Sequence, residues 1–137
     1  MILRSCIVLL LIALVGCGSR PKRPELESSF AELKVATQKL KTAFPKLNAA
    51  VSQAEDSGVF SDEELLEHQK ILGEHEFVLQ MCVKTSGRAK SLLNRKSWEA
   101  SKAEDALERF EFDIENATRS CKAIEDFIEN LESEANN

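Results

Sequence analysis

The residues best suited to metal chemistry are two histidines, which both lie in the stretch EHQKILGEHE. His68 and His75 are seven residues apart. On one helix this spacing separates them by about 10.5 Å, too far for one metal ion to bind both. The alternative is a site formed by His75, Glu74 or Glu76 and a carboxylate of a neighbouring helix. We expect both histidines to be solvated or half-buried, and we predict no bound metal and no cofactor.

Other catalytic patterns are missing from the sequence as well. The chain has no HExxH motif and no glycine-rich loop that could bind a phosphate, and no serine or cysteine stands in a useful sequence context with a histidine. Paired carboxylates are frequent, but charges in such patterns usually lie on solvated helix faces. We therefore predict that the protein is not an enzyme and that it has no catalytic residues.

An apolar segment near the N-terminus bears on where the protein works. The run from Cys6 to Gly18 is well short of the about 20 apolar residues that a helix needs to cross a bilayer. Arg4 precedes this run and small residues end it. This order of charged, apolar and small residues is typical of a secretory signal, so we predict that residues 1–16 are removed as a signal peptide.

Within this segment, Leu14-Val15-Gly16-Cys17 resembles the lipobox of bacterial lipoproteins. The resemblance covers only residues 1–17, and it implies cleavage between Gly16 and Cys17 and lipidation of Cys17. Two or more acyl chains would then anchor the protein stably in a membrane of the bacterial cell envelope. Gly18 stands where an aspartate would retain such a protein in the inner membrane, which favours the outer membrane. The alternative is an ordinary signal peptide with a chance cysteine.

A short basic segment separates this cysteine from the rest of the chain. Residues 17–24 contain Arg20, Lys22 and Arg23 together with two prolines, so we expect an extended tether whose charges face lipid. Residues 25–137 are enough for one compact domain and too few for two. The whole chain has a net charge of −5, and because four cations precede residue 25, the domain carries −9. This acidity argues against nucleic acid as a partner.

Composition and periodicity predict an all-α domain. The chain has few glycines and prolines and is rich in Glu, Lys, Ala and Leu. Apolar residues at alternating spacings of three and four predict helices over about 25–56 and 97–134, and a less regular stripe predicts one over about 61–94. Three helices of nearly equal length joined by short turns can bury these stripes only as an elongated antiparallel three-helix bundle or coiled coil, about 50 Å long.

The stripes also predict which residues form the core. Phe30, Leu72 and Ile124, one from each helix, should all be buried. The complete expected core is Phe30, Leu33, Thr37, Leu40, Phe44, Leu47, Val51 and Ala54, then Leu65, Leu72, Leu79, Cys82, Val83, Ala89 and Leu93, then Ala103, Leu107, Phe110, Ile114, Ala117, Cys121, Ile124, Ile128 and Leu131.

Local signals predict how the helices begin and bend. Pro45 lies inside the first helix, where it removes a backbone donor and clashes with the preceding turn, so we expect a kink or a break there. Ser61 and Glu64 have the spacing of a capping box at the start of the second helix. Ser97 is the expected cap of the third helix.

Two cysteines remain in the domain, and two arguments about them conflict. The oxidising envelope favours a disulfide between Cys82 and Cys121. With the second turn centred near residue 96, however, Cys82 faces the neighbourhood of Phe110, and the two sulfurs lie about 15 Å apart along the axis. A disulfide needs Cα atoms within roughly 7 Å. We predict no disulfide; the alternative requires the turn to move to about residue 101.

Charges separate along the expected bundle. With the anchored end placed at the bottom, Arg88, Lys90, Arg95 and Lys96 join the tether cations at the lower end, where they would attract anionic lipid. The upper end is acidic, and we predict that this acidic tip is a partner surface. The alternative is that the charges lie on ordinary solvated helix faces and that positive and negative charges are separated along the bundle by chance. The predicted surface comprises Glu55, Asp56, Asp62, Glu63, Glu64, Glu67, Glu125, Asp126, Glu129 and Glu132.

Three functions are compatible with these patterns. The preferred one is a lipid-anchored interaction or scaffold protein of the cell envelope, which presents a helical rod with an acidic tip to another envelope protein or to itself. The second is a small-ligand or cation sensor. The third is an inhibitor or an immunity or exclusion lipoprotein, which would show an exposed apolar or aromatic patch. All three place the protein at a membrane through its lipid anchor, and they leave the oligomeric state open.

Overall fold

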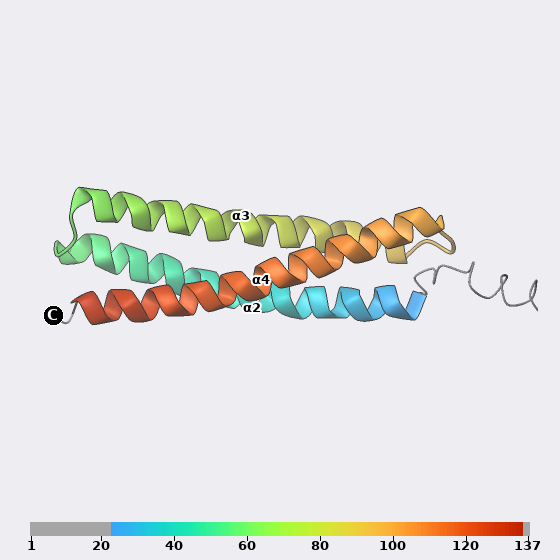
Figure 1. Ribbon diagram of the computed structural model, residues 1–137, viewed down its shortest axis with the longest axis horizontal. Coiled ribbons are helices and arrows are strands. Elements are labelled where there is room, and N and C mark those ends of the chain that lie inside the picture. Colours follow the sequence, from blue (N-terminus) through green and yellow to red (C-terminus); the bar gives the residue numbers. More distant parts are fainter. Residues whose placement is uncertain (1–22, 136–137) are drawn as a thin grey trace, which may run out of the picture.

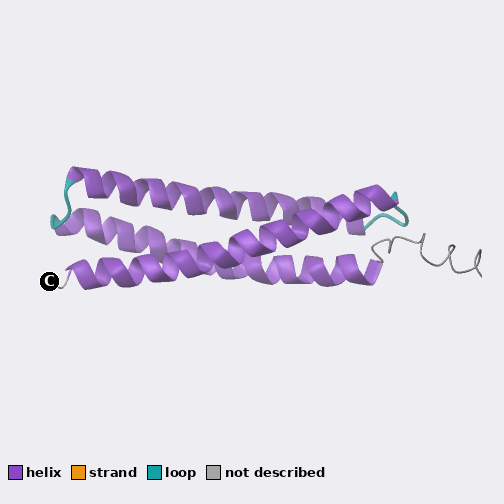
Figure 2. Ribbon diagram, viewed as in Figure 1, coloured by secondary structure: helices purple, strands orange, loops and turns teal. Residues whose placement is uncertain are grey.

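The computed structural model describes residues 23–135, which form three helices and no strand (Figure 1, Figure 2). Helix α2 comprises Arg23–Ser57, α3 comprises Asp62–Leu93 and α4 comprises Ala100–Ala135. Successive helices run in opposite directions along the long axis of the molecule. The predicted all-α three-helix bundle is confirmed. We call the end where α2 meets α3 the tip, and the end where α3 meets α4 the foot.

The chain enters the bundle at the foot. The signal peptide, the lipidated Cys17 and most of the tether fall in residues 1–22, outside the described residues. Helix α2 already begins at Arg23, so the expectation of an extended tether up to residue 24 is wrong at its end. Pro24 is compatible with a helix here, because residues of the first turn donate no intrahelical hydrogen bond. No helix over residues 23–135 is long and apolar enough to cross a membrane.

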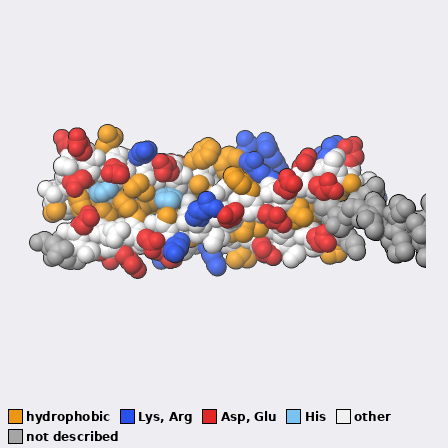
Figure 3. All heavy atoms as spheres, viewed as in Figure 1, with side chains coloured by type: hydrophobic (Ala, Val, Ile, Leu, Met, Phe, Trp, Pro, Cys, Tyr) orange, Lys and Arg blue, Asp and Glu red, His pale blue; other side chains and the backbone are white. Residues whose placement is uncertain are grey.

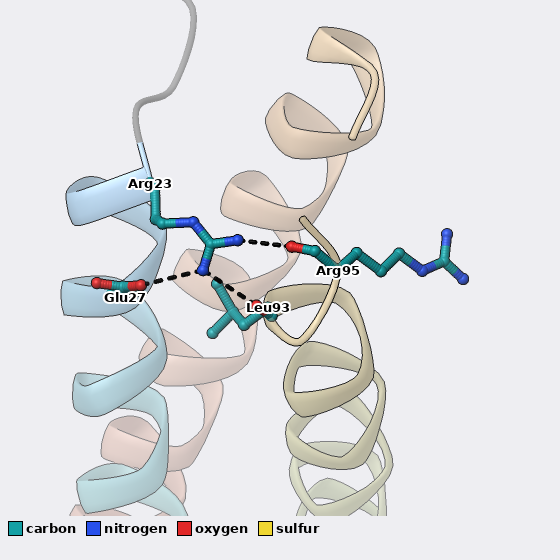
Figure 4. Close-up of polar contacts among 4 residues, drawn as sticks. All are labelled: Arg23, Glu27, Leu93 and Arg95. Atoms are coloured by element: carbon teal, nitrogen blue, oxygen red, sulfur yellow. Dashed lines mark hydrogen bonds and ion pairs between the residues drawn. The ribbon is translucent and has the colours of Figure 1, made fainter. Parts of the chain in front are cut away.

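The side chain of Arg23 joins the start of α2 to the end of α3 (Figure 4). Its guanidinium donates to the carbonyl oxygens of Leu93 and Arg95 at 3.1 and 2.6 Å, and to Glu27 Oε1 at 3.4 Å. The same group lies 4.6 Å from the centre of the Trp98 ring. The last carbonyls of a helix have no intrahelical donor, so Arg23 supplies one. This cation therefore stabilises the foot through contacts within the bundle.

Two apolar clusters fill the interior along the axis. The cluster nearer the foot joins all three helices and contains the aromatic pair Phe30 and Phe110, whose ring centres are 6.2 Å apart. Apolar burial of this kind is the main contribution to the stability of a helical bundle. The buried members are Leu26, Leu33, Ala89, Ala103 and Phe110 in the foot cluster, and Ala36, Leu40, Leu47, Val51, Cys82, Ala117 and Ile124 in the cluster nearer the tip.

The periodicity identified much of this core, but ten of the 24 assigned side chains are only half-buried and one, Val83, is exposed. Ile124 is buried as predicted, but Phe30 and Leu72 are only half-buried. Three helices enclose a narrow interior, so part of a large side chain remains at its edge. Val83 is 43% exposed, because the side chain of its neighbour Cys82 points into the core and successive residues on a helix point about 100° apart.

Of the two alternatives expected at Pro45, a kink or a break, the break is wrong, and so is the expected start of the third helix. Helix α2 continues through Pro45 without a break. Pro45 and Lys41 are both exposed, so water can hydrate the Lys41 carbonyl that loses its donor. Helix α4 begins at Ala100, three residues after the expected cap Ser97. The loop over residues 94–99 is correspondingly longer than expected.

Contacts between α3 and α4 define how the two helices are aligned. Cys82 Sγ lies 3.6 Å from the carbonyl oxygen of Asp113, and His75 Nδ1 lies 2.7 Å from Ser120 Oγ. Cys82 therefore faces Asp113 instead of Phe110, a displacement of less than one helical turn. The late start of α4 accounts for this displacement, because it moves the centre of the turn toward α4.

Both domain cysteines are free thiols in the structure, and their surroundings differ. Cys82 is buried and Cys121 is half-buried. Burial, together with the Asp113 carboxylate, raises the pKa of Cys82 to about 11. Burial and the nearby Glu125 carboxylate also raise the pKa of Cys121.

We predict that Cys82 reacts with iodoacetamide at least about tenfold more slowly than Cys121 at pH 8. The thiolate is the form that reacts with iodoacetamide. The high pKa keeps the Cys82 thiol protonated at pH 8, and burial keeps the reagent away from it. Because the thiolate fraction rises with pH below the pKa, the rate at Cys82 should continue to increase up to about pH 11. Peptide-resolved mass spectrometry measures both rates. Equal rates in the folded protein, or a pair that resists alkylation until it is reduced, would contradict the prediction.

Candidate functional site

The end of α2 determines the shape of the tip. Gly58 has a φ of 67°, the left-handed conformation that ends many helices. Ser57 Oγ donates to the Ala54 carbonyl at 2.7 Å and accepts the backbone N–H of Val59 at 3.3 Å. The chain therefore leaves α2 in a defined turn, and this turn presents Val59 to solvent.

The start of α3 is defined by a capping box, as the sequence predicts. Ser61 Oγ accepts the backbone N–H of Glu64 at 3.4 Å, and the Glu64 carboxylate accepts the backbone N–H of Ser61 at 2.7 Å. The pKa of Glu64 is lowered mainly by the hydrogen bond that its carboxylate accepts from the Ser61 backbone, and the hydrogen bond from the Ser61 hydroxyl lowers it further. Glu64 is thus an ionised structural residue as well as part of the acidic surface.

An aromatic cluster holds the three chain segments of the tip together. The ring of His68 packs edge-on between Phe60 and Phe127, at centre-to-centre distances of 5.1 and 5.3 Å. His68 is buried, so the expectation of a solvated or half-buried residue is wrong for it. Sequence reasoning missed this because the partners come from the turn and from α4. His68 is therefore a packing residue of the tip.

The second histidine lies about two turns further along α3. His75 is half-buried, as expected, and its Nδ1 lies 2.7 Å from Ser120 Oγ of α4. Burial lowers the pKa of His75, and the Glu74 carboxylate opposes this effect. Within residues 23–135, no group of three or more His, Cys, Asp or Glu side chains is arranged to hold a metal ion.

The structure gathers the predicted acidic residues at the tip, and each of them is exposed (Figure 3). They come from the end of α2, the first turns of α3 and the last turns of α4. Two of them have clear roles in the fold: Glu64 caps α3, and Glu55 accepts a hydrogen bond from Gln69 of α3. Over the described residues 50–70 and 123–135 there are eleven acids and one cation, Lys70. The tip therefore has a strongly negative potential.

Two large apolar side chains stand among these acids. Val59 in the turn is 62% exposed, and Leu66 on α3 is 72% exposed. The sequence analysis did not include Leu66 in the partner surface. The available signal was the doublet Leu65-Leu66, because adjacent residues of a helix point about 100° apart and cannot both point straight at the core. Leu65 takes the inward position, and Leu66 is left in solvent.

The foot does not have the purely basic character that its lysines and arginines alone suggest. Its described cations lie beside acids at similar density, and two of them form ion pairs, Arg23 with Glu27 and Lys102 with Glu99, both at 3.4 Å. Such exposed pairs contribute little to stability, but they reduce the net charge of this end. The contrast along the rod is therefore between an acidic tip and a foot of mixed charge.

Comparisons with family models, with curated proteins and with solved structures found no match for this chain. The case for a function therefore depends on the residues and geometry described above.

Proposed function

We propose that the protein is a lipid-anchored interaction protein of the bacterial cell envelope, which presents its acidic tip to a basic surface of a partner protein. The observation that carries this proposal is the exposure of Val59 and Leu66 within a ring of acids from all three helices. Binding surfaces commonly combine a few apolar anchor residues with a polar, charged rim.

Electrostatics supports a basic partner. Eleven acids against one lysine at the tip would speed the encounter with a positively charged protein and would repel acidic ones. Because most of these side chains are exposed and solvated, they contribute more to specificity and association rate than to affinity. Val59 and Leu66 would supply apolar contact area, at about 25 cal/mol per Å² removed from water.

The shape of the bundle also supports this role. Helix α2 has 35 residues, so it holds the tip about 50 Å from the foot, where the chain arrives from residues 1–22. A lipid at Cys17 would place the foot next to the membrane and the tip well away from it. A rigid rod of this kind suits a spacer that positions a binding surface at a set distance from a bilayer.

A second candidate is an inhibitor or immunity-type lipoprotein that binds through the side of the rod. Phe77 on α3 and Phe112 on α4 favour it, because both are large aromatic side chains and both are more than half exposed. Aromatic residues of this kind often act as anchors in protein interfaces. We rank this candidate lower because the two residues belong to different helices and the Arg109 guanidinium lies over the Phe112 ring, 6.0 Å from its centre.

Photo-crosslinking in native envelopes tests the proposal. We expect a photoreactive residue at position 66 to give one dominant adduct with a basic protein, and the same residue at position 77 to give little or none. Position 77 is a matched control, because Leu66 and Phe77 lie on nearly the same face of α3, three turns apart.

Charge reversal completes the test. The double substitution Glu63→Lys and Glu67→Lys should reduce the position-66 adduct at least about tenfold, since it reverses charges beside the anchor residue. A dominant adduct at position 77 alone would instead favour the second candidate. An adduct at position 66 that is unaffected by charge reversal would contradict the proposed electrostatic recognition.

A further inference from the structure

A groove opens between α3 and α4 close to the foot. It has a volume of about 440 Å³ and lies between the last three turns of α3 and the first three turns of α4. These two helices contact each other less extensively than either contacts α2. Residues of both helices line the groove along its length.

Cations dominate the rim of this groove. Arg88 and Arg95 of the α3 end and Lys102 and Arg109 of α4 line it, and the only acid that lines it is Asp105. This concentration of positive charge is notable in a domain with a net charge of −9 over residues 25–137. The acidic tip attracts cations, whereas this groove is suited to anions.

Two of the four cations are available for an anionic ligand. Lys102 pairs with Glu99 at 3.4 Å, and Arg109 lies 3.6 Å from the carboxylate of the buried Asp113. By contrast, the guanidinium groups of Arg88 and Arg95 have no hydrogen-bond or ion-pair partner among the described residues. Arginine binds phosphate well, because its planar guanidinium can donate two parallel hydrogen bonds to phosphate oxygens.

The floor of the groove is apolar. Its exposed part is formed by the half-buried Leu92 of α3 and Ala106 of α4, and Ala89 and Phe110, which lie beneath them, are already buried in the foot core cluster. A free phosphate ion would contact the cationic rim and would leave this floor in water. A molecule with a phosphate group and a hydrocarbon chain would use both, because the chain removes apolar surface from water.

We propose that this groove binds an anionic phospholipid, with the phosphate at Arg88 and Arg95 and part of an acyl chain over the apolar floor. The groove lies at the foot, the end of the bundle at which α2 begins with Arg23. The site depends only on α3 and α4. It therefore does not depend on lipidation of Cys17 or on the proposed partner at the tip.

Native mass spectrometry of the full chain tests this site. The chain is released from non-ionic detergent micelles that contain equal amounts of phosphatidylglycerol and phosphatidylcholine with identical acyl chains. We expect retained adducts to favour phosphatidylglycerol at least about fivefold. The double variant Arg88→Gln and Arg95→Gln should reduce this preference to near one, because it removes the two unpaired cations and leaves the Arg109–Asp113 pair intact.

A matched control removes the same charge from a different groove. Lys39 and Lys46 line an open groove between α2 and α4, and Lys39→Gln with Lys46→Gln should keep the preference within about twofold of the unmodified chain. The circular dichroism of both double variants should remain helical. A loss of preference in both variants, or no preference in the unmodified chain, would overturn the proposal.

Inorganic phosphate separates a lipid site from a site for free phosphate. At about 10 mM, phosphate should leave the phosphatidylglycerol adducts in place, because it cannot replace the contact of the acyl chain with the apolar floor. If phosphate removes these adducts completely, the groove recognises the ion alone and the lipid proposal is wrong.

Discussion

Leu40→Ala is expected to lower the free energy of unfolding by about 3 kcal/mol. Leu40 lies midway along α2, its side chain is fully buried, and it belongs to the core cluster nearer the tip. The substitution removes apolar contacts and leaves a cavity that a narrow bundle can close only in part. Since small domains are stable by only about 5–15 kcal/mol, this loss is a large share of the total. Urea unfolding of a chain without residues 1–22 measures it.

Val35→Ala is the matched control for this experiment. Val35 lies on the same helix, five residues before Leu40, and is 57% exposed. We expect its effect to stay within about 0.5 kcal/mol, because little apolar surface is lost and alanine favours helix. Similar losses for the two variants would mean that the interior described for α2 is not the one that stabilises the protein.

Cys17→Ala should abolish attachment of fatty acid to the protein and should leave either an unlipidated precursor or a soluble product. This expectation follows from the resemblance of Leu14-Val15-Gly16-Cys17 to a lipobox. Stable anchoring by lipid needs two or more acyl chains, which the variant could not acquire at that position. Metabolic labelling with a radioactive fatty acid and fractionation of the cells give the two measurements.

The second cysteine of the same segment provides the control. Cys6→Ala leaves the lipobox intact, so the labelling of this variant should match that of the unmodified chain. Equal labelling of the Cys17→Ala chain would show that lipid is attached elsewhere or not through this thiol. That result would remove the membrane anchor from the proposed function, while the acidic tip and the foot groove could still be tested independently.

Local signals in the sequence were sufficient for the elements and for much of the tip. The alternating spacings of three and four predicted all three helices, and the capping box at Ser61 and Glu64 forms as its residue types require. The acidic character of the tip could also be predicted before the fold was known, because side chains such as Glu63 and Asp126 remain in solvent in a three-helix bundle with this chain order. These features depend on residues that are close together in the chain.

Features that depend on contacts between distant segments were predicted less well. The observed alignment of α3 with α4 differs from the predicted one by less than one helical turn. The alignment depends on where α4 begins, and no strong cap in the sequence marks that start. The aromatic contacts of His68 also come from separate segments.

Sequence alone thus determined that this chain forms three amphipathic helices with acids concentrated at one end, because helix periodicity and solvation of charge are local properties. Only the tertiary structure decided which members of adjacent apolar pairs are exposed, so that Leu66 and Val83 face solvent while Leu65 and Cys82 face inward. It also decided that the cations of α3 and α4 meet across one groove with an apolar floor. The physical reason is that helix rotation and crossing are set by how all the side chains pack together, a property that no single helix has.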